Sequence, residues 1–282
     1  MPGLMMALLV ALPQSQDFSW TGALRAGQVL AVSNINGDVR VEPATGTRAE
    51  VVGVKRAGRY GDPEDVEITA RETSRGVVIC VRYPGPGSSR DRERDEDGCD
   101  HGGGWNDDRG RRNRNDTEVT FTVRLPAGVR VEARTVSGDV TARELRGDAE
   151  VTSVSGNVEV AGFRGERLEA TTVSGDVDLT GVEARQVEAE TVSGNVTFGG
   201  RLDRQGSYDL TTLSGTVLVT LPEGAGADFR ASTFSGTIRM PAGTVTEGST
   251  RRRSRSSGRI GGGGATLTLE SFSGDVEVRV GR

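Results

Sequence analysis

The chain has 282 residues, with 35 basic and 40 acidic residues, a net charge of −5, 34% hydrophobic residues and only 4% aromatic residues. This composition excludes a thick core of large side chains and suits a thin core of Val, Leu, Ala and Thr. It also disfavours a nucleic-acid-binding protein, which normally carries an excess of basic residues.

The first residues have the pattern of an export signal. Leu4 to Leu12 is an apolar run of the length found in signal peptides, and it is too short to span a bilayer as a helix. We therefore expect residues 1–16 to be a signal and the protein to reach the periplasm, the cell surface or the medium. A buried N-terminal strand or helix is the alternative. No other segment is predicted to cross a membrane.

Residues 17–128 form a β-rich N-terminal region that we expect to cap the rest of the chain. The predicted strands are Gln28–Ser33, Asp38–Val41, Ala49–Arg56, Val66–Arg71, Val77–Tyr83 and Glu118–Leu125. A hairpin turn is predicted within Thr69–Val77. Residues 84–116 are rich in Gly, Arg and Asp, with little to bury, and are predicted to be a mobile loop.

Cys80 and Cys99 are the only cysteines. Because an even number of cysteines in an exported protein favours pairing, we predict a disulfide that fixes the polar loop to the sheet. Two unrelated thiols are the alternative.

A six-residue phrase, [T/S]-[V/L/F]-S-G-[D/N/T]-[V/I], occurs seven times, and a weaker copy lies upstream. Its glycines are 18, 19, 19, 21, 21 and 38 residues apart. Because 38 is twice 19, we expect one repeat to be degenerate or replaced by a loop insertion at residues 243–264. The repeat glycines, beginning with the upstream copy, are Gly37, Gly138, Gly156, Gly175, Gly194, Gly215, Gly236 and Gly274.

Apolar residues recur at the same distances from each repeat glycine. The side chains seven, five and three residues before it alternate as in a strand with one buried face. Two residues before it stands another apolar side chain, which predicts a change of phase and a corner. A second strand then begins with an inward-facing apolar residue. These last residues are Val140, Val158, Val177, Val196, Val217, Ile238 and Val276.

The fixed period predicts an all-β fold in which residues 129–282 form a β-solenoid. Each coil would contain two short strands in 19–21 residues and would stack directly on the next. An ordinary β-sandwich is the alternative, although a sandwich does not require such a constant corner.

The repeated T-V-S-G-D-V phrases resemble the bacterial putative-adhesin family of β-strand-repeat proteins, a domain of unknown function. The resemblance covers Gly37–Val41 and Val119 to Arg282, including Leu125-Pro126-Ala127-Gly128. It implies an exported protein without established catalytic residues, so none are transferred to this chain. The long Arg- and Asp-rich insertion departs from the family pattern.

Several motifs suggest chemistry but lack the partners that it needs. His101-Gly102-Gly103-Gly104 resembles an oxyanion-hole phrase, but no G-x-S-x-G motif and no second histidine accompany it. Two cysteines and one histidine do not make an ordinary zinc site. The acidic run from Asp91 to Asp100 lacks EF-hand spacing. Arg251 to Arg259 lacks interleaved aromatic residues. We predict no catalytic residue, no cofactor and no metal site.

A row of acidic residues stands six positions before the repeat glycines and is predicted to face solvent. Stacked carboxylates repel one another by roughly 1 kcal/mol in water, so arginines, a bound cation or a basic partner would have to offset the repulsion. A soluble face that resists sideways aggregation is the simpler interpretation. We call this set the carboxylate row: Glu132, Glu150, Glu169, Glu188 and Asp209.

The sequence as a whole predicts a non-catalytic exported protein, either an adhesin-like module or a binding or scaffold module of the cell envelope. Its expected partner is a surface glycan, an envelope protein or another copy of the chain. One alternative is a scaffold that polymerises end to end. Another is a polysaccharide-active enzyme, which would need clustered acid and base groups on one face.

Overall fold

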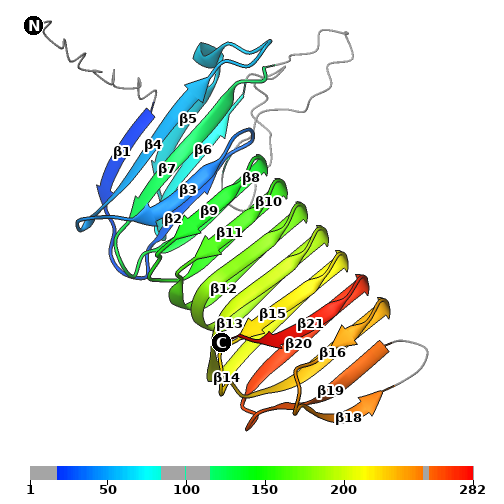
Figure 1. Cartoon of the computed structure of the whole chain (residues 1–282). Coiled ribbons are helices and arrows are strands. Elements are labelled where there is room, and N and C mark those ends of the chain that lie inside the picture. Colours follow the sequence, from blue (N-terminus) through cyan, green and yellow to red (C-terminus); the bar gives the residue numbers. More distant parts are fainter. Residues whose placement is uncertain (1–17, 84–98, 100–114, 250–253, 282) are drawn as a thin grey trace, which may run out of the picture.

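A computed structural model describes residues 18–83, 99, 115–249 and 254–281. The described part is all-β apart from one short 3-10 turn, η1 (Pro63–Asp65), and its strands form a single large, solenoid-like sheet (Figure 1). The predicted all-β class is confirmed. The strands are β1 (Phe18–Ala23), β2 (Val29–Ser33), β3 (Val39–Pro43), β4 (Arg48–Arg56), β5 (Glu67–Glu72), β6 (Gly76–Arg82), β7 (Glu118–Leu125), β8 (Arg130–Ser137), β9 (Val140–Arg143), β10 (Ala149–Ser155), β11 (Val158–Ala161), β12 (Arg164–Ser174), β13 (Val177–Ser193), β14 (Val196–Ser214), β15 (Val217–Leu221), β16 (Ala227–Ser235), β17 (Ile238–Arg239), β18 (Val245–Ser249), β19 (Ser254–Ile260), β20 (Ala265–Ser273) and β21 (Val276–Val280).

Successive repeats lie over one another with equivalent residues in parallel register. Val140 pairs with Val158, which pairs with Val177, which in turn pairs with Val196. All four side chains are fully buried. Because each repeat buries its apolar side against the next, rows of identical Val, Leu and Ala side chains fill the core.

The repeat glycines allow the closest approach between neighbouring repeats. Gly175 has φ of +154°, and a Cβ atom there would lie 2.1 Å from the carbonyl oxygen of Gly156. The same carbonyl accepts a hydrogen bond from the hydroxyl of Thr172 at 2.8 Å. Only glycine fits this contact, since any side chain would overlap the backbone of the neighbouring repeat.

The residue after each glycine ties the corners together. The side-chain oxygen of Asn157 accepts a hydrogen bond from the backbone N–H of Asp176, and Asp176 accepts in the same way from Asn195. Because Asp and Asn alternate from Asp139 to Asn195, two carboxylates are not adjacent in that part of the stack. The Thr-x-Ser-Gly-Asp/Asn phrase is therefore a hydrogen-bonding unit in which each member contacts the neighbouring repeat.

The order of repeats in space differs from their order along the chain at the C-terminal side. β20 pairs in parallel with both β14 and β16, and β21 pairs with both β15 and β17 (Figure 1). The repeat of Gly274 therefore lies between those of Gly215 and Gly236. The chain passes over one layer and later returns to fill it.

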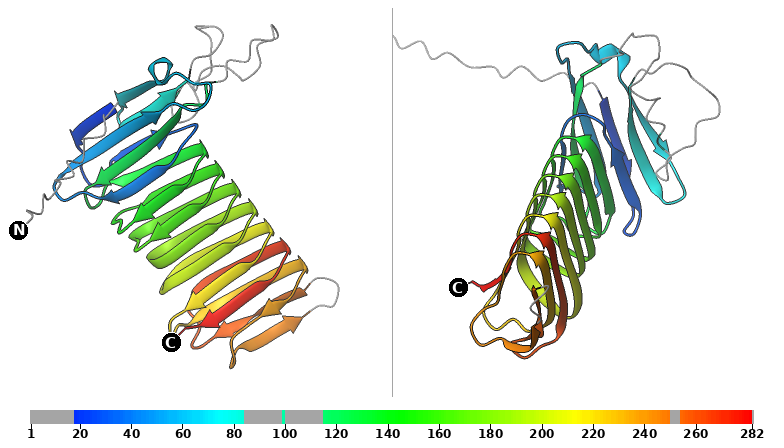
Figure 2. Two further views of the ribbon diagram at one scale, coloured as in Figure 1. Left: turned by 45° about the horizontal axis from the view of Figure 1, so that its top comes forward. Right: turned by 90° about the vertical axis from the view of Figure 1, so that its right-hand side faces the viewer.

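An insertion does separate the repeats of Gly236 and Gly274, but the described part of residues 243–264 forms strands and not the predicted loop. Residues 243–264 contain both β18 and β19, and β19 pairs antiparallel with β16 from Ala227 to Thr233. The spacing of 38 residues therefore does not mark a degenerate repeat. The spacing marks a hairpin of β18 and β19 that pairs with the edge of β16 opposite to β20 (Figure 2).

At the N-terminal side, too, the order of the strands in space differs from their order along the chain. β2 lies between β6 and β8, and β3 lies between β7 and β9, so the weak copy at Gly37 stacks directly on the repeat of Gly138. β1, β4 and β5 extend this end through antiparallel pairs. The predicted hairpin is present, with its turn at Thr73–Gly76 joining β5 to β6.

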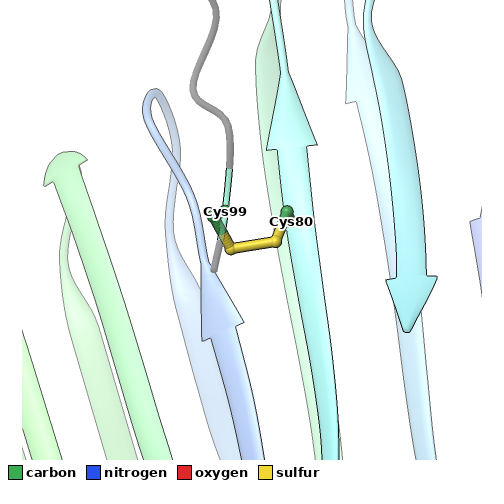
Figure 3. The surroundings of a disulfide bond; sticks show 2 residues. All are labelled: Cys80 and Cys99. Atoms are coloured by element: carbon green, nitrogen blue, oxygen red, sulfur yellow. A yellow bond between two sulfur atoms is a disulfide. The ribbon is translucent and has the colours of Figure 1, made fainter. Parts of the chain in front are cut away.

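The predicted disulfide joins Cys80 on β6 to Cys99, with a Cα–Cα distance of 5.7 Å (Figure 3). Both cysteines pack with Ala31 and Val78 in a small apolar cluster separate from the main core. The predicted mobile loop otherwise lies outside the described residues, except at its last two positions. There, Asn115 is buried and Asp116 accepts hydrogen bonds from the backbone of Arg59 and Tyr60, so those two residues are part of the fold.

We expect Gly175→Ala to lower the free energy of unfolding by about 2 kcal/mol or more, because the new methyl group overlaps a backbone carbonyl. Gly46→Ala is the matched control, since a Cβ atom there meets nothing within 4 Å. Urea unfolding followed by circular dichroism measures both. Equal unfolding midpoints for the two variants would contradict the close contact.

Candidate functional site

The outer face of the sheet carries three rows of side chains that alternate with the buried rows. They stand six, four and two residues before the repeat glycines. The residues that flank the third row pair in register, for example Thr172 with Thr191 and Ser174 with Ser193. Each row therefore runs along the stack, with neighbours about 4.7–4.9 Å apart.

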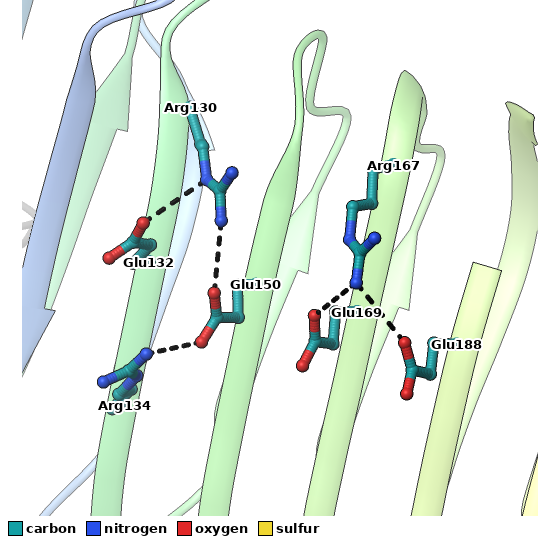
Figure 4. Close-up of polar contacts among 7 residues, drawn as sticks. All are labelled: Arg130, Glu132, Arg134, Glu150, Arg167, Glu169 and Glu188. Atoms are coloured by element: carbon teal, nitrogen blue, oxygen red, sulfur yellow. Dashed lines mark hydrogen bonds and ion pairs between the residues drawn. The ribbon is translucent and has the colours of Figure 1, made fainter. Parts of the chain in front are cut away.

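The carboxylate row is partly buried and is paired with arginines (Figure 4). Glu132 lies 3.4 Å from Arg130, and Glu150 forms ion pairs with both Arg130 and Arg134. Glu132 is only 7% exposed, so its predicted solvent-facing position is wrong. The reason is its place next to Ala31 of β2, where the small apolar cluster around the disulfide begins.

Further along the same row, Arg167 lies 3.1 Å from Glu169 and 3.4 Å from Glu188 (Figure 4). The sequence suggested three ways of offsetting the repulsion between the carboxylates. Arginine pairing is the one that these contacts show. Within the described residues, no group of three or more His, Cys, Asp or Glu side chains could hold a metal ion.

Negative charge remains unbalanced towards the C-terminal side of the row. Burial raises the pKa of Glu188, and the neighbouring carboxylates of Glu169 and Glu190 raise it further, although Arg167 partly opposes them. Burial likewise raises the pKa of Asp209, with an added contribution from Glu270. These two carboxyls are therefore harder to ionise than ordinary surface acids.

The third row is an exposed line of large apolar side chains, which we call the apolar row. The sequence pattern suggested a corner at this position, but alternation continues through it and the phase changes only afterwards. Each member is 40–54% exposed. In spatial order the apolar row is Val136, Val154, Val173, Val192, Leu213, Phe272 and Phe234.

The size of the side chains increases along the apolar row, from valine to leucine to phenylalanine. The last two rings stack face to face, with centroids 4.8 Å apart and planes 3° from parallel. Sequence reasoning identified these residues as a column but missed their exposure. Counting strict alternation from the buried residue seven positions before the glycine would have placed them outside.

A groove of about 490 Å³ runs between the apolar row and the middle row, which stands four residues before the glycines. Its walls come from five neighbouring repeats, from Val173 to Phe234, and Arg255 of β19 lies at its end. Buried hydroxyl residues such as Thr191 and Thr212 form its floor. The middle row contributes two exposed acids, Glu190 and Glu270.

The described part of the chain is an all-β, solenoid-like domain, and the strands before its corner glycines carry parallel rows of side chains on their outer face. A family model described as Toastrack DUF4097, a domain of unknown function, matches residues 112–279. The chain belongs to this family. None of the curated proteins matches the sequence. In the described residues, no helix is long and apolar enough to cross a membrane.

Two solved structures are similar to this chain at low sequence identity. A putative adhesin from Bacteroides fragilis is 10% identical, with a TM-score of 0.40, and the match covers 95% of this chain and 98% of that one. A putative cell adhesion protein from Clostridium sporogenes is 11% identical, with a TM-score of 0.38 and coverage of 94% and 99%.

We expect the double variant Glu188→Gln/Asp209→Asn to melt at a higher temperature than wild type at pH 7. Folding raises both pKa values, so ionisation of these groups destabilises the folded state. This cost is absent below the ordinary carboxyl pKa of about 4 and grows as pH rises through the raised values. The gain in melting temperature should therefore disappear near pH 3.

Glu277→Gln is the control for the sign of this effect. Arg279 lowers the pKa of Glu277, so its ionisation stabilises the folded state, and removing the charge should lower the melting temperature at pH 7. Thermal unfolding at several pH values measures both variants. A gain for the double variant that is the same at pH 3 and pH 7 would contradict an electrostatic origin.

Proposed function

We propose that the chain is a non-catalytic, adhesin-like binding module exported to the cell envelope, in which stacked two-strand coils of about 19–21 residues hold one rigid binding face. The observation that carries this proposal is the apolar row. Seven large apolar side chains in a line are each 40–54% exposed. Contiguous apolar surface of this kind is typical of interaction sites.

Two features support export. The apolar run Leu4–Leu12 has the length of a signal segment. The disulfide between Cys80 and Cys99 is a bond that persists in oxidising compartments and is rare in the cytosol.

The repetition of the outer face supports binding rather than catalysis. Catalysis needs unlike groups that converge on one reacting bond, whereas each row here offers similar groups at equal intervals. A row suits contact with an elongated partner. The names of the two similar solved structures, both associated with adhesion, agree with this proposal.

The test compares binding of the full chain to fragments of bacterial cell envelope on a biosensor. We expect Val192→Ser/Leu213→Ser to bind at least about tenfold more weakly, because central apolar contacts dominate interfaces. Val280→Ser is the matched control, since Val280 is 45% exposed but lies outside the apolar row. Undiminished binding by the double variant, or no binding by wild type, would overturn the proposal.

A further inference from the structure

The groove beside the apolar row combines two kinds of wall. One wall is apolar and includes Val192, Leu213 and Phe272, and the other contains the carboxylates of Glu190 and Glu270. A ligand that fills the groove must satisfy both walls, so its contacting face must be both apolar and charged.

The acids around the groove determine which charge the contacting face of the ligand must carry. Glu190, Glu270 and Asp209 form no ion pair with any basic side chain in the described part of the chain. Glu188 and Asp209 belong to the adjacent carboxylate row. Burial raises the pKa of both, and nearby carboxylates raise each further: Glu169 and Glu190 for Glu188, and Glu270 for Asp209. Added positive charge would therefore be favourable here. Among the described residues, Arg255 is the one basic residue lining the groove, and it lies at the end, in the layer beyond Phe234.

A second copy of the chain fits this face poorly. If two outer faces met across a two-fold axis with antiparallel stacks, the carboxylate row of one copy would lie against that of the other. Like charges opposed in this way weaken an interface and suppress pairing. The face complements a basic surface better than it complements itself.

The spacing of the two acids indicates the shape of the partner. Glu190 and Glu270 belong to repeats two layers apart, because β13 pairs with β14 and β14 pairs with β20. They are thus separated by about 9.5 Å along the stack. Residues seven apart on an α-helix are separated by about 10.5 Å along the helix axis, so a helix presents basic side chains at nearly this interval.

We propose that the groove binds an amphipathic, cationic α-helix of a partner protein, laid along the stack. Its apolar stripe packs against Val192, Leu213, Phe272 and Phe234, and its basic residues contact Glu190 and Glu270. This inference rests on the proposed binding function and specifies the partner. It is a helix-in-groove mode of recognition, in which apolar anchors are flanked by complementary charges.

The test uses three labelled 18-residue helical peptides and the full chain in fluorescence polarisation. One peptide has a leucine stripe and lysines, the second has leucines and glutamates, and the third has serines in place of leucines and keeps the lysines. We expect the first to bind at least about tenfold more tightly than the others, because both walls must be satisfied. Raising the salt concentration should weaken the binding of the leucine–lysine peptide.

Two variants locate the site. Glu190→Gln/Glu270→Gln should weaken the leucine–lysine peptide about fivefold, the loss expected for two exposed charge pairs. Leu213→Ser/Phe272→Ser should weaken it more than tenfold. Glu223→Gln, at an exposed turn, and Val280→Ser are matched controls that should change nothing.

Each of the following outcomes would overturn this inference. The leucine–glutamate peptide binds as tightly as the leucine–lysine peptide, the Glu190/Glu270 variant binds normally, or the chain forms a dimer that Leu213→Ser disrupts. If the chain binds envelope fragments through the apolar row but ignores all three peptides, the cationic helix is wrong and the binding function stands. If Val192→Ser/Leu213→Ser leaves envelope binding unchanged, the binding function itself is wrong.

Discussion

The contact between corner glycines of neighbouring repeats is the constraint on which the rest of the structure depends. A Cβ atom at Gly156, Gly175 or Gly194 would lie 1.9–2.1 Å from the glycine carbonyl of the neighbouring repeat. With glycine in place, the backbones approach closely enough for the Thr hydroxyls and the Asp or Asn side chains to bond across the layers. The hydrophobic rows of the core then come into register as a consequence.

The same register also dictates the outer face. If equivalent residues stack inside, equivalent residues must also stack outside, and like charges then become neighbours. Arg130 and Arg167 offset this for the carboxylate row, each contacting two glutamates. The apolar row needs no such compensation, because its neighbouring side chains are uncharged. Its side chains are about half exposed to water, which is why we propose that it binds a partner.

The sequence was sufficient to predict the buried rows, because Val140, Val158, Val177 and Val196 recur at fixed distances from a glycine that only a close contact explains. It was also sufficient for the disulfide between Cys80 and Cys99. It was insufficient for the order of the layers. Since the corners are nearly identical, the repeat of Gly274 fits on that of Gly215 as well as the repeat of Gly236 does. The burial of Glu132 was equally hidden, because it depends on Ala31, which is distant in the sequence and adjacent only in the fold.

The layers that lie out of sequence order also affect how the structure can unfold and fold. In a simple spiral the outermost turn can peel away while the others remain. Here β20 and β21 are held on both sides, and so are β2 and β3. Releasing either pair requires the strands beyond it to separate first. Assembly has a matching order requirement: the edge of β14 stays without its parallel partner until β20 is available, after β16 to β19 have been synthesised. The stack is therefore interlocked near both ends, and unwinding from an end is obstructed by segments that lie elsewhere in the sequence.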